Sequence, residues 1–188
     1  MLRRSFLTLP TLAMVPGQLL AAGLDAVRSI KPMVRSGQDR EGKARAIGLS
    51  STTYKVLTAD SGGDLFVMEQ SNNRRGGPSR HIHHHEDELF FCLEGQYVVE
   101  VNDTRYVLDP GDCILGPRGL PHAWAFSGHT VGRMLISFAP AGKMEAFFAQ
   151  RQASGIKPGE YARTKSDAAF MAAFGLEYVG PPIALSSL

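Results

Sequence analysis

From about residue 50 onward, short apolar runs alternate with turn-forming residues, which is the pattern of an all-β fold. The runs contain β-branched, aromatic and aliphatic residues, and Gly, Asn, Asp and Pro separate them. Tight turns are indicated at residues 60–63 (DSGG), 94–95 (EG) and 102–103 (ND). The runs predict eight strands, at residues 53–58, 65–69, 88–93, 96–101, 105–108, 113–115, 122–126 and 133–138. Short antiparallel strands at this spacing favour a sandwich or a closed barrel.

The carboxyl-terminal segment, residues 141–188, has a helical pattern instead. A first helix is expected over residues 143–152. Its positions at helical spacing are Met144, Phe147, Phe148 and Arg151, of which the three apolar ones are expected to face the barrel. A second helix is expected over residues 167–174, with Ser166 as N-cap and Gly175 as its stop. We interpret both helices as packing elements, and a lid over the barrel mouth is the alternative.

The amino terminus, residues 1–22, is interpreted as an export signal. The sequence RRSFL at positions 3–7 is followed by a moderately apolar stretch and by small residues at positions 21–23. This resembles a twin-arginine signal, which implies a periplasmic or secreted protein that has folded before export. Two prolines and Gln18 interrupt the stretch, so no stable membrane anchor is expected. The alternative is a cytosolic protein with an apolar amino-terminal tail.

Composition supports a single folded domain. The chain has 188 residues, of which 44% are hydrophobic and 20% charged, enough to bury a core and to exclude a disordered polyampholyte. Lys and Arg number 20 against 18 Asp and Glu, so there is no basic footprint for nucleic acid. Residues 23–49 show no clear apolar period and are expected to form an arm on a barrel spanning residues 50–140. Cys92 and Cys113 are expected to be free thiols, with a disulfide as the alternative.

Chemistry concentrates in residues 81–88, HIHHHEDE. In a strand, alternate side chains share a face, so His81 and His83 project together, a spacing suited to two imidazoles on one metal. Glu88 lies at an odd offset from His83, and it joins the same face only if residues 84–87 form a turn that resets the phase. His84 and His85 then belong to that turn, and His129, beside a glycine, belongs to a loop.

With the phase reset, the strand that starts at Glu88 has a clear inside and outside. Glu88, Phe90 and Cys92 are expected to point inward. Leu89, Phe91 and Leu93 are expected to point outward, against the arm, the helices or a second subunit. An inward Glu88 adds a carboxylate to the two imidazoles and leaves coordination positions open for water or substrate.

These residues resemble the first motif of the cupin superfamily, G(X)5HXH(X)4E(X)6G. His81, His83, Glu88 and Gly95 keep the pattern, and the leading Gly is represented only by the slightly displaced Gly76 and Gly77. The second motif, G(X)5PXG(X)2H(X)3N, is met by Gly111, Pro117, Gly119 and His122, with Phe126 in place of Asn. The resemblance implies a double-stranded β-helix (jelly-roll) barrel and a fourth ligand, His122. The implied metal ligands are His81, His83, Glu88 and His122.

The surroundings of these ligands indicate the kind of substrate. By strand alternation Phe90 and Cys92 follow Glu88 inward, and Trp124 follows His122, which predicts an aromatic-walled substrate pocket. Such walls suit a small apolar or aromatic molecule better than a sugar phosphate. Simple core packing is the alternative for Phe90 and Trp124. Arg118 is interpreted as a salt-bridged surface residue rather than a substrate ligand.

The resemblance extends to quercetin dioxygenase-like cupins and implies a metal-dependent dioxygenase for a small aromatic or enolic substrate, with Glu88 as catalytic base. Two alternatives stay open. One is a metal-dependent isomerase, lyase or decarboxylase, and the other is a non-catalytic cupin that binds a metal or a small molecule. Three His and one Glu accept one divalent Fe, Mn, Ni, Cu, Co or Zn ion. A homodimer formed through the outer sheet is the favoured assembly.

Overall fold

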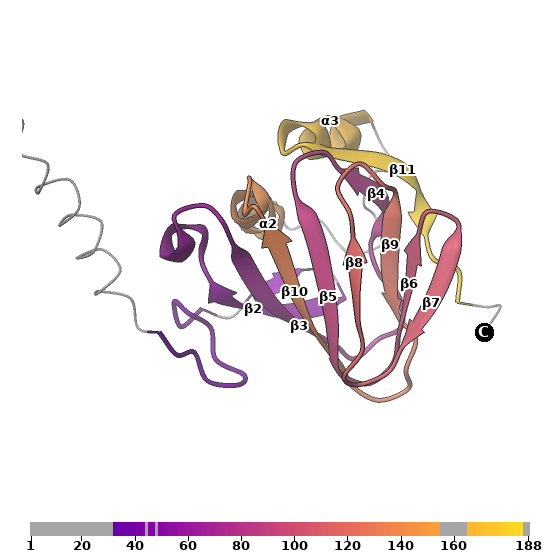
Figure 1. Cartoon of the computed structure of the whole chain (residues 1–188), viewed down its shortest axis with the longest axis horizontal. Helices are drawn as coiled ribbons and strands as arrows, with labels where there is room; N and C mark the ends of the chain where they lie inside the picture. The colour runs from indigo at the N-terminus through magenta and orange to yellow at the C-terminus, as the bar shows by residue number, and fades with distance from the viewer. Residues whose placement is uncertain (1–31, 44, 48, 155–164, 186–188) are drawn as a thin grey trace, which may run out of the picture. The chain divides into compact units, whose positions relative to one another are not determined.

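The computed structural model describes residues 32–43, 45–47, 49–154 and 165–185, and β-strands dominate them (Figure 1). The strands are β1 (Arg45–Ile47), β2 (Ser50–Val56), β3 (Phe66–Asn72), β4 (Ser79–His83), β5 (Asp87–Glu94), β6 (Tyr97–Val101), β7 (Thr104–Leu108), β8 (Cys113–Gly116), β9 (His122–Phe126), β10 (Gly132–Ala139) and β11 (Leu176–Pro182). The helices are the 3-10 helix η1 (Thr58–Ser61), α2 (Met144–Ala153) and α3 (Lys165–Ala173). The export signal expected at residues 1–22 lies outside the described residues.

Two antiparallel sheets face each other and enclose the core. One has six strands in the order β1-β2-β3-β10-β5-β8, and the other has five in the order β11-β4-β9-β6-β7. Figure 1 shows the two sheets side by side, with α3 and β11 at one end of the barrel. Neighbours in each sheet are mostly distant in sequence, as in a jelly roll. The predicted all-β barrel with a short helical extension is confirmed.

The sequence pattern located eight of the eleven strands that the described residues form. All eight predicted strands are present, and that at residues 122–126 has the predicted bounds. Gly62 and Gly63 adopt φ of 69° and 101° in the expected turn, which also contains η1. β1, β4 and β11 are absent from the eight predicted ranges, although the shared face expected for His81 and His83 assumed a strand where β4 lies. β1 has three residues and lies within the segment interpreted as an arm, and β11 ends in Gly-Pro-Pro, a sequence that argues against a strand.

The predicted phase reset before Glu88 is confirmed. Glu88, Phe90 and Cys92 are 3%, 0% and 0% exposed, whereas Leu89 and Leu93 are 38% and 37% exposed. The connection between β4 and β5 is one residue shorter than expected, because Asp87 already belongs to β5.

The two helices extend the core beyond the barrel. Met144 and Phe147 are buried, and Phe148 is partly buried against the same apolar cluster, as the helical spacing predicted. Gly175, at φ 79°, ends the second helical segment as expected. Ser166 as N-cap is wrong, because α3 begins at Lys165 and Ser166 lies within it. The cap assignment failed because boundary signals carry less information than periodicity.

The sulfur atoms and the helix lengths of the described residues complete the picture. Cys92 is a buried free thiol and Cys113 an exposed one, so the prediction of two free thiols is confirmed. Within the described ranges, no helix has both the length and the apolar character needed to span a membrane.

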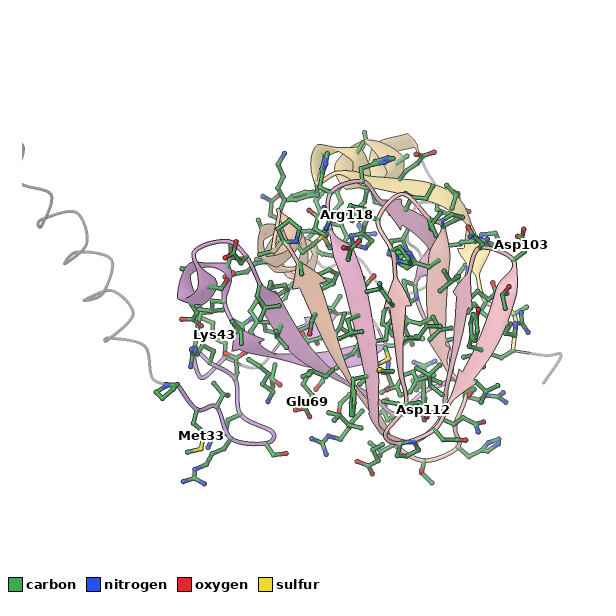
Figure 2. All side chains as sticks on the ribbon, in the orientation of Figure 1. Met33, Lys43, Glu69, Asp103, Asp112 and Arg118 are labelled. Atoms are coloured by element: carbon green, nitrogen blue, oxygen red, sulfur yellow. The ribbon has the colours of Figure 1, made fainter. Side chains whose placement is uncertain are left out.

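Arg118 and Asp112 mark opposite ends of the barrel. Figure 2 shows Arg118 at the end that carries the helices and Asp112 at the other.

The Arg118 guanidinium donates to both carboxylate oxygens of Asp87, at 3.0 and 2.8 Å, and the pair is partly exposed. Arg118 is therefore a salt-bridged surface residue, as predicted.

Candidate metal centre

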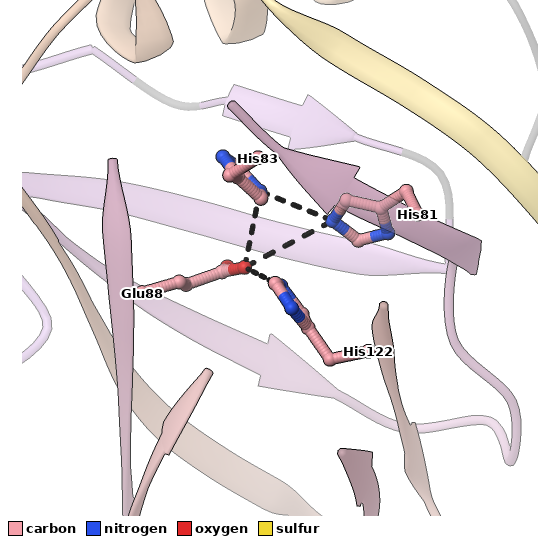
Figure 3. A group of neighbouring side chains, drawn as sticks. All are labelled: His81, His83, Glu88 and His122. Atoms are coloured by element: carbon pink, nitrogen blue, oxygen red, sulfur yellow. Dashed lines mark hydrogen bonds and ion pairs between the residues drawn. The ribbon is translucent and has the colours of Figure 1, made fainter. Parts of the chain in front are cut away.

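Strand pairing brings four predicted ligands together inside the barrel. His81 and His83 lie on β4, Glu88 on β5 and His122 on β9. β4 and β9 are neighbours in the five-stranded sheet, and His81 pairs directly with His122. Glu88 reaches the cluster from the opposite sheet (Figure 3). All four residues are buried.

The distances within the cluster are those of a ligand set. The four donor atoms lie within 4.8 Å of one another. His83 Nε2 lies 3.1 Å from His81 Nε2 and 3.2 Å from Glu88 Oε2, and His122 Nε2 lies 3.0 Å from Glu88 Oε2 (Figure 3). Nitrogen and oxygen ligands held at about 2.0–2.2 Å from one ion are separated by about 3 Å. The residues present therefore fit a single divalent ion.

The outer nitrogens of the imidazoles support the same conclusion. His81 Nδ1 donates to the Ser79 carbonyl at 2.8 Å, and His122 Nδ1 donates to the Leu120 carbonyl at 3.0 Å. A carbonyl only accepts, so the proton sits on Nδ1 in the neutral ring and the Nε2 lone pair faces the cluster. These two rings are thus held in the tautomer that a metal requires.

Burial and mutual proximity shift the pKa values of the cluster. Burial, together with the neighbouring His122 and His83, lowers the pKa of His81 to about 3. Burial alone would lower the pKa of His83, but the Glu86 and Glu88 carboxylates outweigh it and raise the pKa to about 9. Burial alone would raise the pKa of Glu88, but the neighbouring His122 and His83 rings outweigh it and hold the pKa below its usual value. The donor set thus contains an ionised carboxylate and a neutral His81, and protons compete with a metal for His83.

A cavity of about 90 Å³ adjoins the cluster, and His81, His83 and Glu88 form part of its wall. Apolar side chains from both sheets and both helices form much of the rest. They include Met68, Trp124, Ile136, Met144, Phe147, Phe148 and Met171. Because α2 and α3 contribute to this wall, the helices cover the cavity as well as pack on the barrel.

The three predicted pocket residues lie at different depths. Trp124, 6% exposed, lines the cavity. Phe90 points inward as expected but packs in the core, with its ring centroid 6.1 Å from that of His122. Cys92 lies further along β5, with its Sγ 3.5 Å from the Gly95 carbonyl oxygen. The pocket assignment of Phe90 and Cys92 is wrong: neither is among the described residues that line the cavity, and both belong to the buried apolar core.

The remaining histidines of the HIHHHEDE segment and beyond lie away from the cluster, as expected. His84 Nε2 lies 3.1 Å from a carboxylate oxygen of Glu177, and both side chains are about half exposed. His85 and His129 are exposed.

Sequence reasoning missed several polar residues near the cluster. Glu86 was assigned only to the turn before the strand that starts at Glu88, with no role of its own, yet it is 1% exposed and faces His83. Gln70 and Asn72 line the cavity from β3. They continue the two-residue period of Phe66 and Met68, and this period could have predicted that they point inward. Arg151 also lines the cavity and is 2% exposed. Its helical spacing with the buried residues of α2 was the signal that could have predicted this position.

Comparison with known proteins gives one family match. Residues 67–138 match the family model described as the cupin domain. A curated relative, quercetin 2,3-dioxygenase from Bacillus subtilis (strain 168), is 26% identical over 97 residues. That alignment covers 50% of this chain and 28% of the relative, so the chain spans less than a third of the relative's length.

Two solved structures show the same fold. A predicted oxalate decarboxylase from Thermotoga maritima has a TM-score of 0.53 at 16% identity, covering 57% of this chain and 98% of that one. An RmlC-like cupin from Shewanella frigidimarina NCIMB 400 has a TM-score of 0.50 at 18% identity, covering 62% and 96%. At these identities the similarity is one of fold.

Proposed function

We propose that this chain, which contains a cupin domain, is a metal-dependent dioxygenase that acts on a small aromatic or enolic substrate. One observation carries the proposal: three imidazole nitrogens and one carboxylate converge within 4.8 Å at the wall of a largely apolar cavity. The partial similarity to a quercetin 2,3-dioxygenase supports this choice of reaction.

His81, His83, His122 and Glu88 would hold the ion. Bound there, a divalent Fe, Mn, Ni, Cu, Co or Zn ion supplies open coordination positions and lowers the pKa of a hydroxyl group that it binds. The carbonyls of Ser79 and Leu120 keep His81 and His122 oriented towards that ion.

Glu88 is the proposed general base. It is the carboxylate of the cluster, it is ionised, and it lies at the cavity wall where a substrate hydroxyl would enter. The proton leaves the enol or phenol oxygen of the substrate and is held on a carboxylate oxygen of Glu88. Its Oε2 lies 3.2 Å from His83 Nε2 and 3.0 Å from His122 Nε2, so the carboxylate already lies beside the other proposed ligands.

The cavity walls perform the second task, which is to select and shield the substrate. Trp124, Phe147 and Phe148 offer flat apolar surfaces in the cavity that His81, His83 and Glu88 also line. Such a wall favours an aromatic ring and excludes water from the reacting end of the substrate.

Export and dimerisation are further parts of the proposal. Cell fractionation of the full chain is expected to place it in the periplasm, and replacement of the arginine pair at positions 3–4 by lysines is expected to keep it in the cytosol.

Leu89 and Leu115 pair across β5 and β8 and are 38% and 48% exposed, which supports an outer-sheet dimer contact. Light scattering of the purified protein measures the assembly.

Elemental analysis and oxygen uptake test the function together. Wild-type protein is expected to carry close to one metal ion per chain and to consume oxygen with flavonols or other enolic aromatic compounds. His81→Ala and Glu88→Ala are expected to lose the metal and the uptake. His129→Ala, which changes an exposed loop histidine, serves as the matched control.

Three results separate the alternatives. Bound metal without oxygen uptake across the panel, but with substrate turnover, would favour an isomerase, lyase or decarboxylase. Bound metal with no turnover would favour a binding protein. Metal content that both substitutions leave unchanged would refute the ligand assignment.

A further inference from the structure

Glu86 is a buried carboxylate that the proposed reaction does not use. It lies in the connection between β4 and β5 and is 1% exposed. Its Oε2 lies 3.5 Å from Nδ1 of His83, the nitrogen that faces away from the metal cluster. Within the described ranges, neither atom has a hydrogen-bond partner at normal distance, although both are buried. Buried polar atoms are rarely left in this state, so these two are placed to satisfy each other.

The backbone of a separate loop makes room for this carboxylate. Gly142 lies between β10 and α2 and has a φ of 51°. A Cβ at position 142 would fall 1.8 Å from Glu86 Oε1. The absence of a side chain at Gly142 therefore allows the carboxylate to lie in the barrel wall rather than in solvent.

In the other two histidines of the cluster, the outer ring nitrogen, Nδ1, has a hydrogen-bond acceptor, and the same is expected of His83. His81 and His122 each donate Nδ1–H to a backbone carbonyl and so present Nε2 to the cluster. His83 presents Nε2 to the same cluster, 3.1 Å from His81 Nε2 and 3.2 Å from Glu88 Oε2. Its Nδ1 faces a carboxylate instead of a carbonyl. A carboxylate that accepts from the outer nitrogen fixes the ring and makes the inner nitrogen a stronger donor.

We infer that Glu86 is a positioning residue of the metal centre, which accepts the Nδ1–H of His83 and thereby orients its Nε2 towards the ion. The inference rests on the metal site of the proposed function and is independent of the reaction catalysed there. Among the described residues, Glu86 belongs neither to the four clustered donors nor to the lining of the cavity, so it would act through His83.

A cobalt(II) titration of the full-length chain tests this role. The affinity is measured by competition with a chromophoric chelator for wild type, Glu86→Ala, Glu86→Gln and Glu177→Gln. Glu177 is the matched control, because its carboxylate also contacts a histidine, His84, but at the exposed surface. The thermal midpoint of each metal-free protein is recorded beside the affinity.

The expected result is a loss of cobalt affinity with little loss of fold. Glu86→Ala is expected to weaken binding by about 10- to 100-fold, the range typical of such outer partners. Glu86→Gln keeps an acceptor oxygen, so a smaller loss is expected, and Glu177→Gln is expected to bind like wild type. The ligand-field absorption of bound cobalt should shift in both Glu86 variants, which a merely structural role would not produce.

A second readout needs no metal. In the metal-free protein, histidine ¹⁵N chemical shifts report which ring nitrogen carries the proton. Wild-type His83 is expected to carry a proton on Nδ1, and the ¹⁵N shift of that atom is expected to move in Glu86→Ala, which removes the carboxylate that accepts the proton. If Glu86→Ala fails to fold, the cobalt affinity and ¹⁵N shifts of Glu86→Gln decide.

Cobalt binding within about twofold of wild type in Glu86→Gln and Glu86→Ala, with unchanged ¹⁵N shifts, would overturn the inference. A wild type that binds cobalt in a His81-dependent way but consumes no oxygen removes the proposed reaction and leaves the role of Glu86 intact. A wild type that binds no cobalt overturns both.

Discussion

At the scale of single residues, the cluster is stable in a buried position because its polar atoms face one another or the backbone. His122 Nε2 and Glu88 Oε2 are 3.0 Å apart, and His81 Nδ1 meets a carbonyl at 2.8 Å. An isolated buried charge would be strongly unfavourable, whereas a paired and hydrogen-bonded one is tolerated. The same pairing keeps the donor atoms oriented towards one point.

Some positions near the cavity require glycine because another part of the chain passes close to them, and not only because a turn requires it. A Cβ on Gly77 would fall 1.8 Å from the backbone carbonyl oxygen of Trp124, and a backbone atom cannot rotate away. We expect Gly77→Ala to lower the free energy of unfolding by about 1–3 kcal/mol, the usual effect of overpacking.

Urea denaturation measures this effect, and Gly180→Ala is its control. The nearest atom to a Cβ at Gly180 is 3.5 Å away, an ordinary contact, so little change is expected there. Equal stability of the two variants would contradict the contact at Gly77.

At the scale of elements, the segment before β2 is held to the barrel by charge. Arg45 on β1 forms ion pairs with Asp39 and Glu41, and its guanidinium lies 3.8 Å from the Tyr54 ring centroid. Asp39 Oδ2 also accepts the Tyr54 N–H at 2.7 Å. Burial alone would raise the pKa of Asp39, but these hydrogen bonds outweigh it and hold the pKa below its usual value. The segment is therefore attached to the barrel by polar contacts. Its sequence showed no strand-like pattern that would have predicted them.

Asp39→Asn is expected to destabilise the protein at neutral pH and to matter less in acid. Because the folded pKa is lowered, the carboxylate stabilises the fold above its unfolded pKa of about 3.9, and this contribution is lost as the pH falls through the folded value. At pH 7 the loss is about 1.5–3 kcal/mol, as for hydrogen bonds to a charged group.

Urea unfolding at pH 7 and at pH 3 checks this sign. The difference between wild type and Asp39→Asn should shrink at the lower pH. Asp103→Asn, which changes a fully exposed side chain, is the control at both values. A difference that grows in acid would refute the assignment.

At the scale of the whole molecule, the four candidate metal ligands come from both sheets. Glu88 belongs to the six-stranded sheet, whereas His81, His83 and His122 belong to the five-stranded sheet. An ion held by all four would connect the sheets at the end of the cavity. Because such an ion binds the folded state, it adds to the stability of the whole barrel.

Removal of metal is therefore expected to lower the thermal midpoint. At a free metal concentration of 100 times Kd, binding to the folded state alone adds about 2.7 kcal/mol. Calorimetry before and after chelation measures the shift, and His122→Ala should show none. A midpoint that chelation leaves unchanged in wild type would argue against a metal that bridges the sheets.

Local pattern determined much of this protein by itself. The two-residue period of strands placed Glu88, Phe90 and Cys92 inside the barrel, and the motif spacing of His81, His83 and Glu88 predicted that these three side chains lie in one cluster. These features could be predicted because strand alternation and turn chemistry depend on neighbours in sequence.

Tertiary structure decided the features that depend on distant contacts. Glu86 is polar and follows a run of histidines, yet the loop around Gly142 encloses it beside His83. β11 forms despite Gly180 and its following prolines because β4 offers an edge for pairing. The helices supply part of the cavity wall, whereas their sequence pattern left the choice between packing elements and a lid open. Burial and edge pairing depend on which surfaces meet in the folded protein. The sequence of one segment does not specify the distant segment against which it packs.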